Sequence, residues 1–479
     1  MYIGIDIGTS SVKSTVIDSH AHIIYEDKEA YPMSINGLEA EQNPIDWFNA
    51  TLKVLKNIPN VYKAQVKKIG FSGQMHSLVV LDKDGDVIRP AILWNDQRTY
   101  NEVQLLLDHF GLDGITRLTS NIPLTGFTAP KLLWMKHNEK ENFDKIHKIL
   151  LPKDYIVYRL TEIYATDYSD ASGTLMLDVE NKKWSKEVIE YLGIKVSALP
   201  KLHDAKDVIG QMTKENVQLL GFQHPVDIMI GGSDQSIGAL GALVIDKNEV
   251  SIAMGTSGVI YLNLDIYQDD PSQSLHVFAN AIGGYHFMGV MLTCAQSLKW
   301  WQDITNEENI ETLINRVENL ENDVLFLPYL QGERTPINNP FAKAIFYGLT
   351  LNHTQKDMTL AILEGVGFAL KDILNAMNES KISINKAYIS GGGTKSSLWM
   401  QMISDILGIE LIVSETSDTV SYGAALLGII QDQGIEALAA LKKSKNNGNY
   451  FKPNAAKLSY YSLKFQQFKL LYKYNVMSH

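Results

Sequence analysis

The sequence lacks the features that mark secreted, membrane-spanning or nucleic-acid-binding proteins. It has one cysteine, Cys294, in 479 residues, so no internal disulfide can form and a reducing cytoplasm is the expected location. No apolar run approaches the roughly 18 residues of a membrane span, and no basic, cleavable leader precedes the first strand-like segment. The net charge of −11 is not offset by any basic tract. We therefore predict a cytoplasmic protein with neither nucleic acid nor membrane as a partner.

Two common nucleotide-binding motifs are also missing. Neither G-x-G-x-x-G nor G-x-x-x-x-G-K-[ST] occurs, which removes support for a dinucleotide-binding Rossmann domain and for a P-loop. The twelve histidines are scattered and indicate no zinc site. If the protein binds a nucleotide, it must do so with another kind of loop.

Extended and helical patterns alternate along the chain, which predicts an α/β architecture. The first part suggests strands over 2–7, 14–19 and 22–27, a helix over 44–58 and a strand over 67–73. A core-facing helix is expected over 360–377, followed by a strand over 386–390 and a helix over 398–408. The length suggests two to four domains, and we place the main boundary at the polar residues 246–248, giving domains 1–246 and 247–479.

One short loop is written twice. The segment "IDIGTSSV" (5–12) has a near copy, "IAMGTSGV" (252–259), about half the chain later. A Gly-Thr-Ser turn between two strands is usually an ordinary hairpin, but its backbone N–H groups also suit phosphate oxygens. Two copies on opposite sides of a cleft would clamp a polyphosphate. Only the first copy carries an acid, Asp6 against Ala253, and a single carboxylate suits one Mg²⁺ bound to ATP.

Three further segments have both a structural and a functional interpretation. In "GGSDQ", Asp234 lies where a strand gives way to a helix, as a helix-capping residue or as a general base. The segments "SGQMHS" and "LWNDQR" place His76 and Trp94 in a polar cluster with one aromatic ring, typical of a sugar pocket, although a lone histidine is often structural. The loop "GGGTKSS" (391–397) is either a plain strand–helix turn or a close approach to adenosine.

Taken together and in this order, these segments resemble the FGGY carbohydrate kinases, and within that family the xylulokinase branch. The matching stretches cover most of the chain and include "YIGIDIGTSSVK", "GQMH", "PAILWNDQR", "GFTAPKLLW", "LLPKDY", "GGSDQ", "FLPYLQGERTP", "LEGVGFAL" and "SGGGTKSSLWMQM". The resemblance implies two ribonuclease-H-like (actin-like ATPase) domains with the catalytic cleft between them. It also implies phosphorylation of D-xylulose to D-xylulose 5-phosphate by Mg-ATP, and it is compatible with a homodimer.

The resemblance also implies roles for individual residues. Asp234 would be the catalytic base, and Asp6 would lie near the phosphates and hold Mg²⁺ through water. The sugar would contact Met75, His76, Trp94, Asp234 and Gln235. The ATP-binding residues would be Gly8, Thr9, Ser10, Lys13, Gly255 and Thr256 near the phosphates, with Gly392 and Ser396 near the adenosine.

The sequence departs from the usual family pattern at Ser77, Ser233 and Gln235, which bears on the choice of sugar more than on the reaction. The alternatives are a kinase of the same family acting on ribulose, glycerol or gluconate, and an actin-like nucleotide switch that phosphorylates no sugar.

Overall fold

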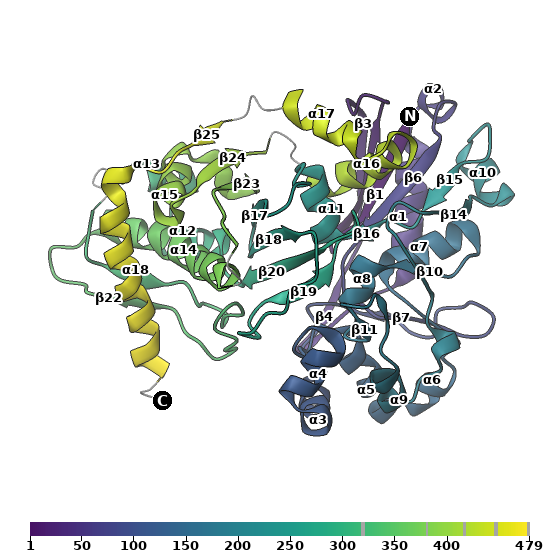
Figure 1. Cartoon of the computed structure of the whole chain (residues 1–479), viewed down its shortest axis with the longest axis horizontal. Helices are drawn as coiled ribbons and strands as arrows, with labels where there is room; N and C mark the ends of the chain where they lie inside the picture. The colour runs from purple at the N-terminus through teal and green to yellow at the C-terminus, as the bar shows by residue number, and fades with distance from the viewer. Residues whose placement is uncertain (318–320, 380–381, 415–417, 445–448, 477–479) are drawn as a thin grey trace.

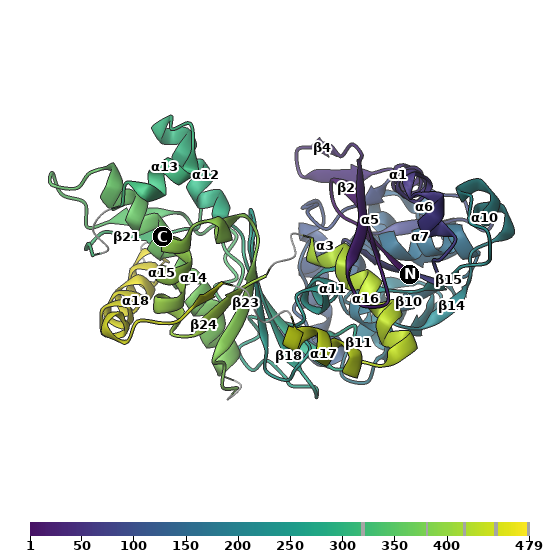
Figure 2. The same ribbon diagram turned by 90° about the horizontal axis from the view of Figure 1, so that it is seen from above.

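The computed structural model describes residues 1–317, 321–379, 382–414, 418–444 and 449–476. Two lobes lie side by side, one built around the N-terminal strands and one around the strands that follow residue 249 (Figure 1). Figure 2 shows the two lobes from above, with β17, β18 and β23 of the second lobe facing the first.

The sheet of the first lobe is mixed, with antiparallel pairs at one side and parallel pairs in the middle. Its order is β3 (Ile23–Ala30), β2 (Ser11–Ile17), β1 (Tyr2–Ile7), β6 (Lys68–Gly73), β15 (Asp227–Met229) and β14 (Val208–Gln211). The short strand β16 (Gly232–Ser233) extends the pairing along β6. Every residue of β1 is buried, as expected for a central strand covered on both faces. The predicted three strands, helix and following strand are present as β1, β2, β3, α1 and β6, and two short strands that the sequence did not predict, β4 (Ser34–Asn36) and β5 (Glu39–Gln42), precede the helix.

The sheet of the second lobe repeats this arrangement. Its order is β19 (His276–Ala279), β20 (Tyr285–Met291), β18 (Gly258–Leu264), β17 (Val250–Met254), β23 (Lys386–Ser390), β24 (Glu410–Val413) and β25 (Tyr450–Phe451). The strand β17 pairs antiparallel with β18 and parallel with β23, as β1 does with β2 and β6. Each Gly-Thr-Ser loop therefore joins the first two strands of its own sheet.

Helices cover both sheets. The main helices of the two lobes are α1 (Pro44–Asn57), α7 (Pro152–Thr161), α11 (Asp234–Gly241), α12 (Ala295–Thr305), α14 (Gln355–Asn378), α15 (Ser397–Leu407), α16 (Thr419–Gln433), α17 (Glu436–Ser444) and α18 (Ala455–Val476). The helix α5 (Thr128–Asn138) packs instead against α3 (Tyr100–Phe110), α6 (Lys140–Asp144) and α9 (Lys186–Leu192). The helix α1 begins where the Asn43 side chain accepts a hydrogen bond from the N–H of Ile45, with Pro44 in the first turn. The helices predicted over 360–377 and 398–408 are confirmed as α14 and α15.

The part of the chain that follows β6 and precedes β14 forms a smaller layer, which lies at the lower end of the first lobe in Figure 1. It includes α3 (Tyr100–Phe110), α4 (Leu112–Thr119), α9 (Lys186–Leu192) and the short strands β7 (Val79–Leu81) and β9 (Lys148–Leu150). Its apolar core is continuous with the second lobe, because Met75 and Phe127 belong to the same cluster as Phe278, Met288 and Val290 of β19 and β20. The edge of the second sheet therefore closes over this layer.

The helix α16 belongs to the second half of the sequence but packs on the sheet of the first lobe (Figures 1 and 2). The contact is backbone to backbone, since a methyl group at Gly4 would lie 1.9 Å from the carbonyl oxygen of Ser421. On its other side, α16 meets α11 equally closely, and a methyl group at Gly423 would lie 2.0 Å from the carbonyl oxygen of Ile237. The helix α16 thus follows the predicted boundary at residue 246 in the chain but packs on the sheet of the first lobe through close glycine contacts.

We expect Gly4→Ala to lower the free energy of unfolding by about 3 kcal/mol, because the added methyl group cannot fit without moving α16 off the sheet. Urea denaturation would measure it. Gly114→Ala is the matched control, since its methyl group would meet no atom closer than 3.6 Å within a helix. Equal stability of the two variants would contradict this account of the contact.

Candidate active site

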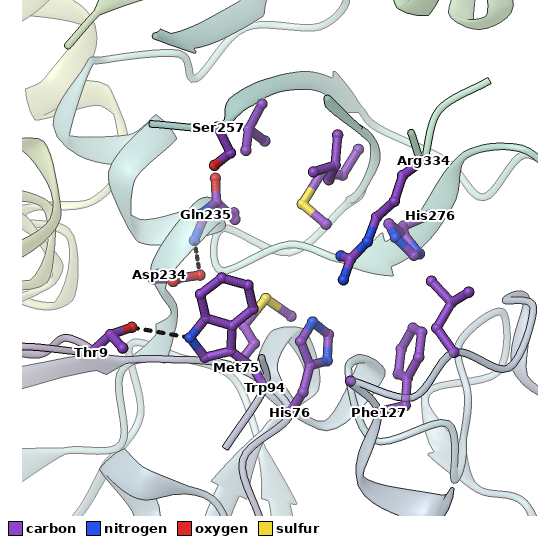
Figure 3. Close-up of a pocket in the computed structure, with 15 residues that line it drawn as sticks. Thr9, Met75, His76, Trp94, Phe127, Asp234, Gln235, Ser257, His276 and Arg334 are labelled. Atoms are coloured by element: carbon purple, nitrogen blue, oxygen red, sulfur yellow. Dashed lines mark hydrogen bonds between the residues drawn. The ribbon is translucent and has the colours of Figure 1, made fainter. Parts of the chain in front are cut away.

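A cavity of about 190 Å³ lies where the two lobes meet (Figure 3). Six of the residues singled out from the sequence line it: Thr9, Met75, His76, Trp94, Asp234 and Gln235. The remaining lining residues are Leu124, Gly126, Phe127, Ser257, Val259, His276, Met288, Val290 and Arg334. Apolar walls with a few polar groups are typical of a pocket for a small polar molecule.

His76 is held in one orientation and in one protonation state. Its Nδ1 lies 2.6 Å from the carbonyl oxygen of Gly173, which can only accept, so Nδ1 carries the proton and Nε2 is left as an acceptor. Burial lowers the pKa of His76 to about 3, so the ring is neutral at physiological pH. The ring packs edge-on against Phe127, with centroids 4.8 Å apart. Glycine is required at 173, because a methyl group there would lie 2.6 Å from Nδ1.

Trp94 connects the pocket to the first Gly-Thr-Ser loop. Its indole N–H donates to the hydroxyl of Thr9 at 3.0 Å, and its backbone N–H donates to the hydroxyl of Ser77 at 3.1 Å. Ser77 is fully buried and does not line the cavity, so its effect on a ligand acts through the placement of Trp94.

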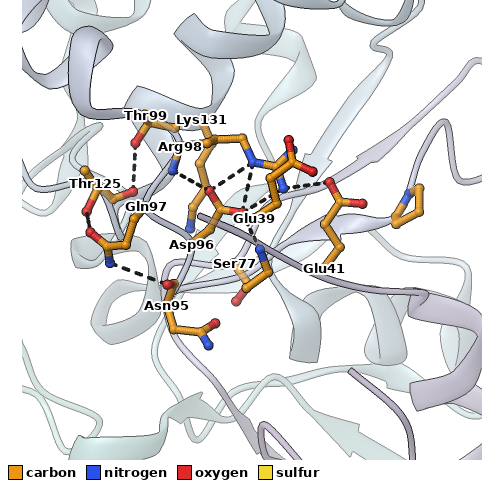
Figure 4. Close-up of polar contacts among 12 residues, drawn as sticks. Glu39, Glu41, Ser77, Asn95, Asp96, Gln97, Arg98, Thr99, Thr125 and Lys131 are labelled. Carbon is orange, nitrogen blue, oxygen red and sulfur yellow. Dashed lines mark hydrogen bonds and ion pairs between the residues drawn. The ribbon is translucent and has the colours of Figure 1, made fainter. Parts of the chain in front are cut away.

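The loop that follows Trp94 is fixed by a buried ionic network (Figure 4). The Asp96 carboxylate accepts from the Arg98 guanidinium at 2.7 Å and from the backbone N–H of Ala40 at 2.7 Å. Arg98 also pairs with Glu41 at 2.8 Å. Nearby, the buried Lys131 side chain donates to the carbonyl oxygens of His76 at 2.9 Å and Gly126 at 2.7 Å, which ties two cavity-lining segments together.

Asp234 opens α11 at the side of the cavity near Thr9 (Figure 3). One carboxylate oxygen accepts from the backbone N–H of Gln235 at 2.7 Å. Burial raises the pKa of Asp234 to about 6, against the lowering effect of its hydrogen bonds with Gln235. A carboxylate with a pKa near neutrality is suited to accept a proton.

The first Gly-Thr-Ser loop turns its carbonyl groups into the protein. The Tyr31 hydroxyl donates to the carbonyl oxygen of Gly8, the Gln42 amide donates to that of Thr9 at 2.7 Å, and the Tyr31 N–H donates to that of Ser10 at 3.3 Å. Within the described part of the chain, the N–H groups of Thr9 and Ser10 have no acceptor. The loop therefore presents donors outward, as an anion site requires.

Asp6 lies buried beneath this loop among other charges. Its Oδ1 has no hydrogen-bond donor among the described residues. Burial, together with the Asp418 and Asp234 carboxylates, raises the pKa of Asp6 to about 8 against the lowering effect of Lys13. Lys13 pairs with Asp418 at 3.1 Å, so it faces these acids. No group of three or more metal-binding side chains occurs among the described residues, so an ion here would need ligands from elsewhere.

The second loop is anchored differently. The carbonyl oxygens of Gly255 and Thr256 accept from the N–H groups of Ala295 and Cys294 at 3.0 and 2.9 Å, at the start of α12. The loop after β23 lies beside it because β17 and β23 are parallel neighbours. Gly392 in that loop has open space around it, and the Ser396 hydroxyl caps α15 by accepting from the N–H of Trp399 at 3.2 Å.

The cavity also contains residues that the sequence did not single out individually, although Ser257 belongs to the second Gly-Thr-Ser loop. Arg334, His276 and Ser257 come from three separate segments of the second lobe and meet only in the folded chain. Arg334 belongs to the motif "GERTP", which the resemblance includes without indicating that its side chain enters the pocket.

Comparison with known proteins identifies the family. The model of the N-terminal domain of the FGGY family of carbohydrate kinases matches residues 1–241, and that of the C-terminal domain matches residues 250–431. The chain belongs to this family. It is therefore a carbohydrate kinase with the two-domain, actin-like fold expected from its sequence.

Individual relatives match over the whole length of this kinase. The xylulose kinase of Escherichia coli (strain K12) is 36% identical over 99% of both chains. Among solved structures, a xyloylose kinase from Brucella ovis is 32% identical over 100% of both chains, with a TM-score of 0.95. A gluconate kinase from Lactobacillus acidophilus is 26% identical over 98% of this chain and 97% of its own, with a TM-score of 0.90. None of the helices that the structure describes has the length and apolar character needed to cross a membrane.

We expect the ring of His76 to stay neutral between pH 5 and pH 8, because burial lowers its pKa to about 3. Nuclear magnetic resonance of histidine-labelled protein would measure this, with the resonance assigned by its loss in His76→Gln. A midpoint inside that range would contradict the buried, Gly173-bonded state.

Proposed function

We propose that this kinase transfers the γ-phosphoryl group of ATP to the 5-hydroxyl of D-xylulose. The observation that carries the proposal is the position of Asp234, on the wall of a sugar-sized cavity that also contains Thr9 and Ser257 from the two phosphate-loop candidates. The xylulose kinase relative that matches the whole chain supports this choice of sugar.

In the proposed reaction, the oxygen of the sugar 5-hydroxyl attacks the γ-phosphorus, and Asp234 accepts the proton of that hydroxyl. The bond between that phosphorus and the bridging oxygen breaks, and ADP leaves. His76 would hold the sugar through its free Nε2, Gln235 would contribute an amide beside Asp234, and Met75 and Trp94 would form apolar walls.

The phosphates would bind between the two loops. The free N–H groups of Thr9 and Ser10 fit phosphate oxygens, with Gly8, Gly255 and Thr256 forming the turns and Lys13 nearby. Gly392 and Ser396 would lie at the adenosine, where the open space around Gly392 leaves room for a ring.

Asp6 fits a role in holding Mg²⁺, because it is a buried carboxylate with an oxygen that no described donor satisfies. Because no group of three metal-binding side chains occurs among the described residues, the ion would take its other ligands from water and phosphate, as Mg²⁺ commonly does. Bound there, Mg²⁺ would neutralise charge on the phosphates during transfer.

The test is ADP release from Mg-ATP with D-xylulose, D- and L-ribulose, glycerol and gluconate, together with a sample lacking sugar. We expect D-xylulose to give the highest kcat/KM. A higher kcat/KM with another sugar would identify that sugar as the substrate and leave the proposed reaction unchanged. ADP release that does not depend on sugar would favour a nucleotide switch.

We expect Asp234→Asn to lower kcat by at least about 100-fold while D-xylulose still binds, because the shape is kept and the base is lost. In the unaltered enzyme, kcat/KM should rise with pH and reach half its maximum near pH 6, since Asp234 must be deprotonated to act. Steady-state kinetics from pH 5 to 8 and calorimetric titration with sugar measure both. Unchanged turnover in the variant would refute the assignment of the base.

We expect Asp6→Asn to stabilise the ligand-free protein by roughly 2 kcal/mol at pH 8 and less at pH 5. The native pKa of Asp6, about 8, is above its ordinary 3.8, so its protonated form contributes stability that is lost as pH rises through 8. The same variant should show a smaller rise in Tm with Mg-ADP. Thermal denaturation measures both effects, with the exposed Asp84→Asn as control. A full Mg-ADP shift in Asp6→Asn would remove Asp6 from the metal site.

A further inference from the structure

Arg334 is a charged residue of the cavity. It lines the pocket, and within the described part of the chain its guanidinium makes no hydrogen bond, ion pair or ring contact. Burial lowers the pKa of Arg334, and it remains protonated because arginine does not lose its proton in proteins. Its N–H donors thus face the cavity, where solvent or a bound ligand can accept their hydrogen bonds.

The backbone around Arg334 is rigidly attached to the pocket wall. The N–H of Thr335 donates to the carbonyl oxygen of Val290 at 3.0 Å, and the N–H of Val290 donates to the Thr335 hydroxyl at 3.1 Å. On the other side, the Glu333 carboxylate accepts from the N–H of Leu292 at 2.9 Å. These bonds join residues 333–335 to β20 and the residue after it, and they direct the side chain between them into the cavity.

The titratable groups near Arg334 are Glu333, His76 and His276. The adjacent Glu333 carboxylate lies close enough for each group to stabilise the charge of the other. His76 and His276 are neutral, because burial lowers the pKa of each ring and the Arg334 charge lowers it further. Burial raises the pKa of Glu333 to about 7, so it is only a partial counter-charge at neutral pH, and Arg334 needs hydrogen-bond acceptors.

Arg334 and Asp234 lie on opposite sides of the cavity (Figure 3). Arg334 points toward His76 from the side of His276, whereas Asp234 lies with Thr9 and Gln235. The phosphate-loop residues are on the Asp234 side. The guanidinium therefore faces the end of a bound sugar that does not react, and it is badly placed to contact the transferred phosphoryl group.

We propose that Arg334 is a specificity-determining residue that donates hydrogen bonds to the oxygens on C1 and C2 of the ketose. The inference rests on the proposed function, which places the 5-hydroxyl at Asp234 and so places C1 and C2 at the other end. The C2 carbonyl oxygen only accepts hydrogen bonds and guanidinium only donates them, so the two groups match. A planar fork of donors also suits two neighbouring oxygens.

The experiment compares D-xylulose with 1-deoxy-D-xylulose, which lacks only the C1 oxygen, as substrates of the unaltered enzyme and of Arg334→Gln. Arg316→Gln is the matched control, because Arg316 is an arginine of the same lobe that pairs with Glu307 at the surface.

For D-xylulose, we expect Arg334→Gln to raise KM by about 10- to 100-fold with kcat nearly unchanged. For 1-deoxy-D-xylulose, the loss should be at least about 5-fold smaller, because one of the two contacts is already missing. A partly unfolded variant would not change this result, because KM does not depend on the fraction of folded enzyme. Arg334→Lys keeps the charge and loses the planar fork of donors, so its KM for D-xylulose should lie between those of the unaltered enzyme and Arg334→Gln.

Other outcomes would overturn the inference. An equal loss on both sugars would place Arg334 away from C1, and a fall in kcat with unchanged KM would assign it to the phosphoryl group. If Arg334→Gln lost only the phosphorylation of gluconate, Arg334 would be a binding residue for a carboxylate. Failure of the unaltered enzyme to phosphorylate D-xylulose would instead refute the proposed function.

Discussion

The packing of α16 between the first sheet and α11 is the contact on which the rest of the site depends. At Gly4 and again at Gly423 it has no room for a side chain, because backbone meets backbone there. This helix starts at Asp418, whose carboxylate caps it by accepting from the N–H groups of Val420 and Ser421. Because this cap lies over the first sheet, Asp418 from late in the chain comes close to Asp6 and Lys13 from the start of the chain.

The same contact also positions Asp234, the proposed base. The helix α11 packs on α16 and begins with Asp234, so the orientation of the base follows from a helix crossing and not from a flexible loop. Asp6, Asp234 and Asp418 are near enough for the latter two to raise the pKa of Asp6, with Lys13 as the cation that opposes them. This concentration of buried negative charge is unfavourable by itself, and a bound cation would relieve it.

The pocket divides into two functional ends. Near the loops, hydroxyl, amide and carboxylate groups surround the reacting position. At the other end lie two neutral histidines, Phe127 and the guanidinium of Arg334. Rigid supports stand behind both ends, in the Asp96–Arg98 network and in the bonds of Thr335 to β20. A ligand therefore meets groups whose orientation is set before it arrives.

Local patterns in the chain were sufficient to predict the alternating strands and helices, the duplicated loop and the strand-to-helix position of Asp234, because strand and helix periods and turn residues are properties of neighbouring residues. They also indicated His76 and Trp94 as pocket residues. The return of α16 to the first lobe, the buried position of Ser77 and the entry of Arg334 into the cavity could not be predicted in this way. Each depends on which backbones approach closely across hundreds of residues, and that is decided by packing in three dimensions.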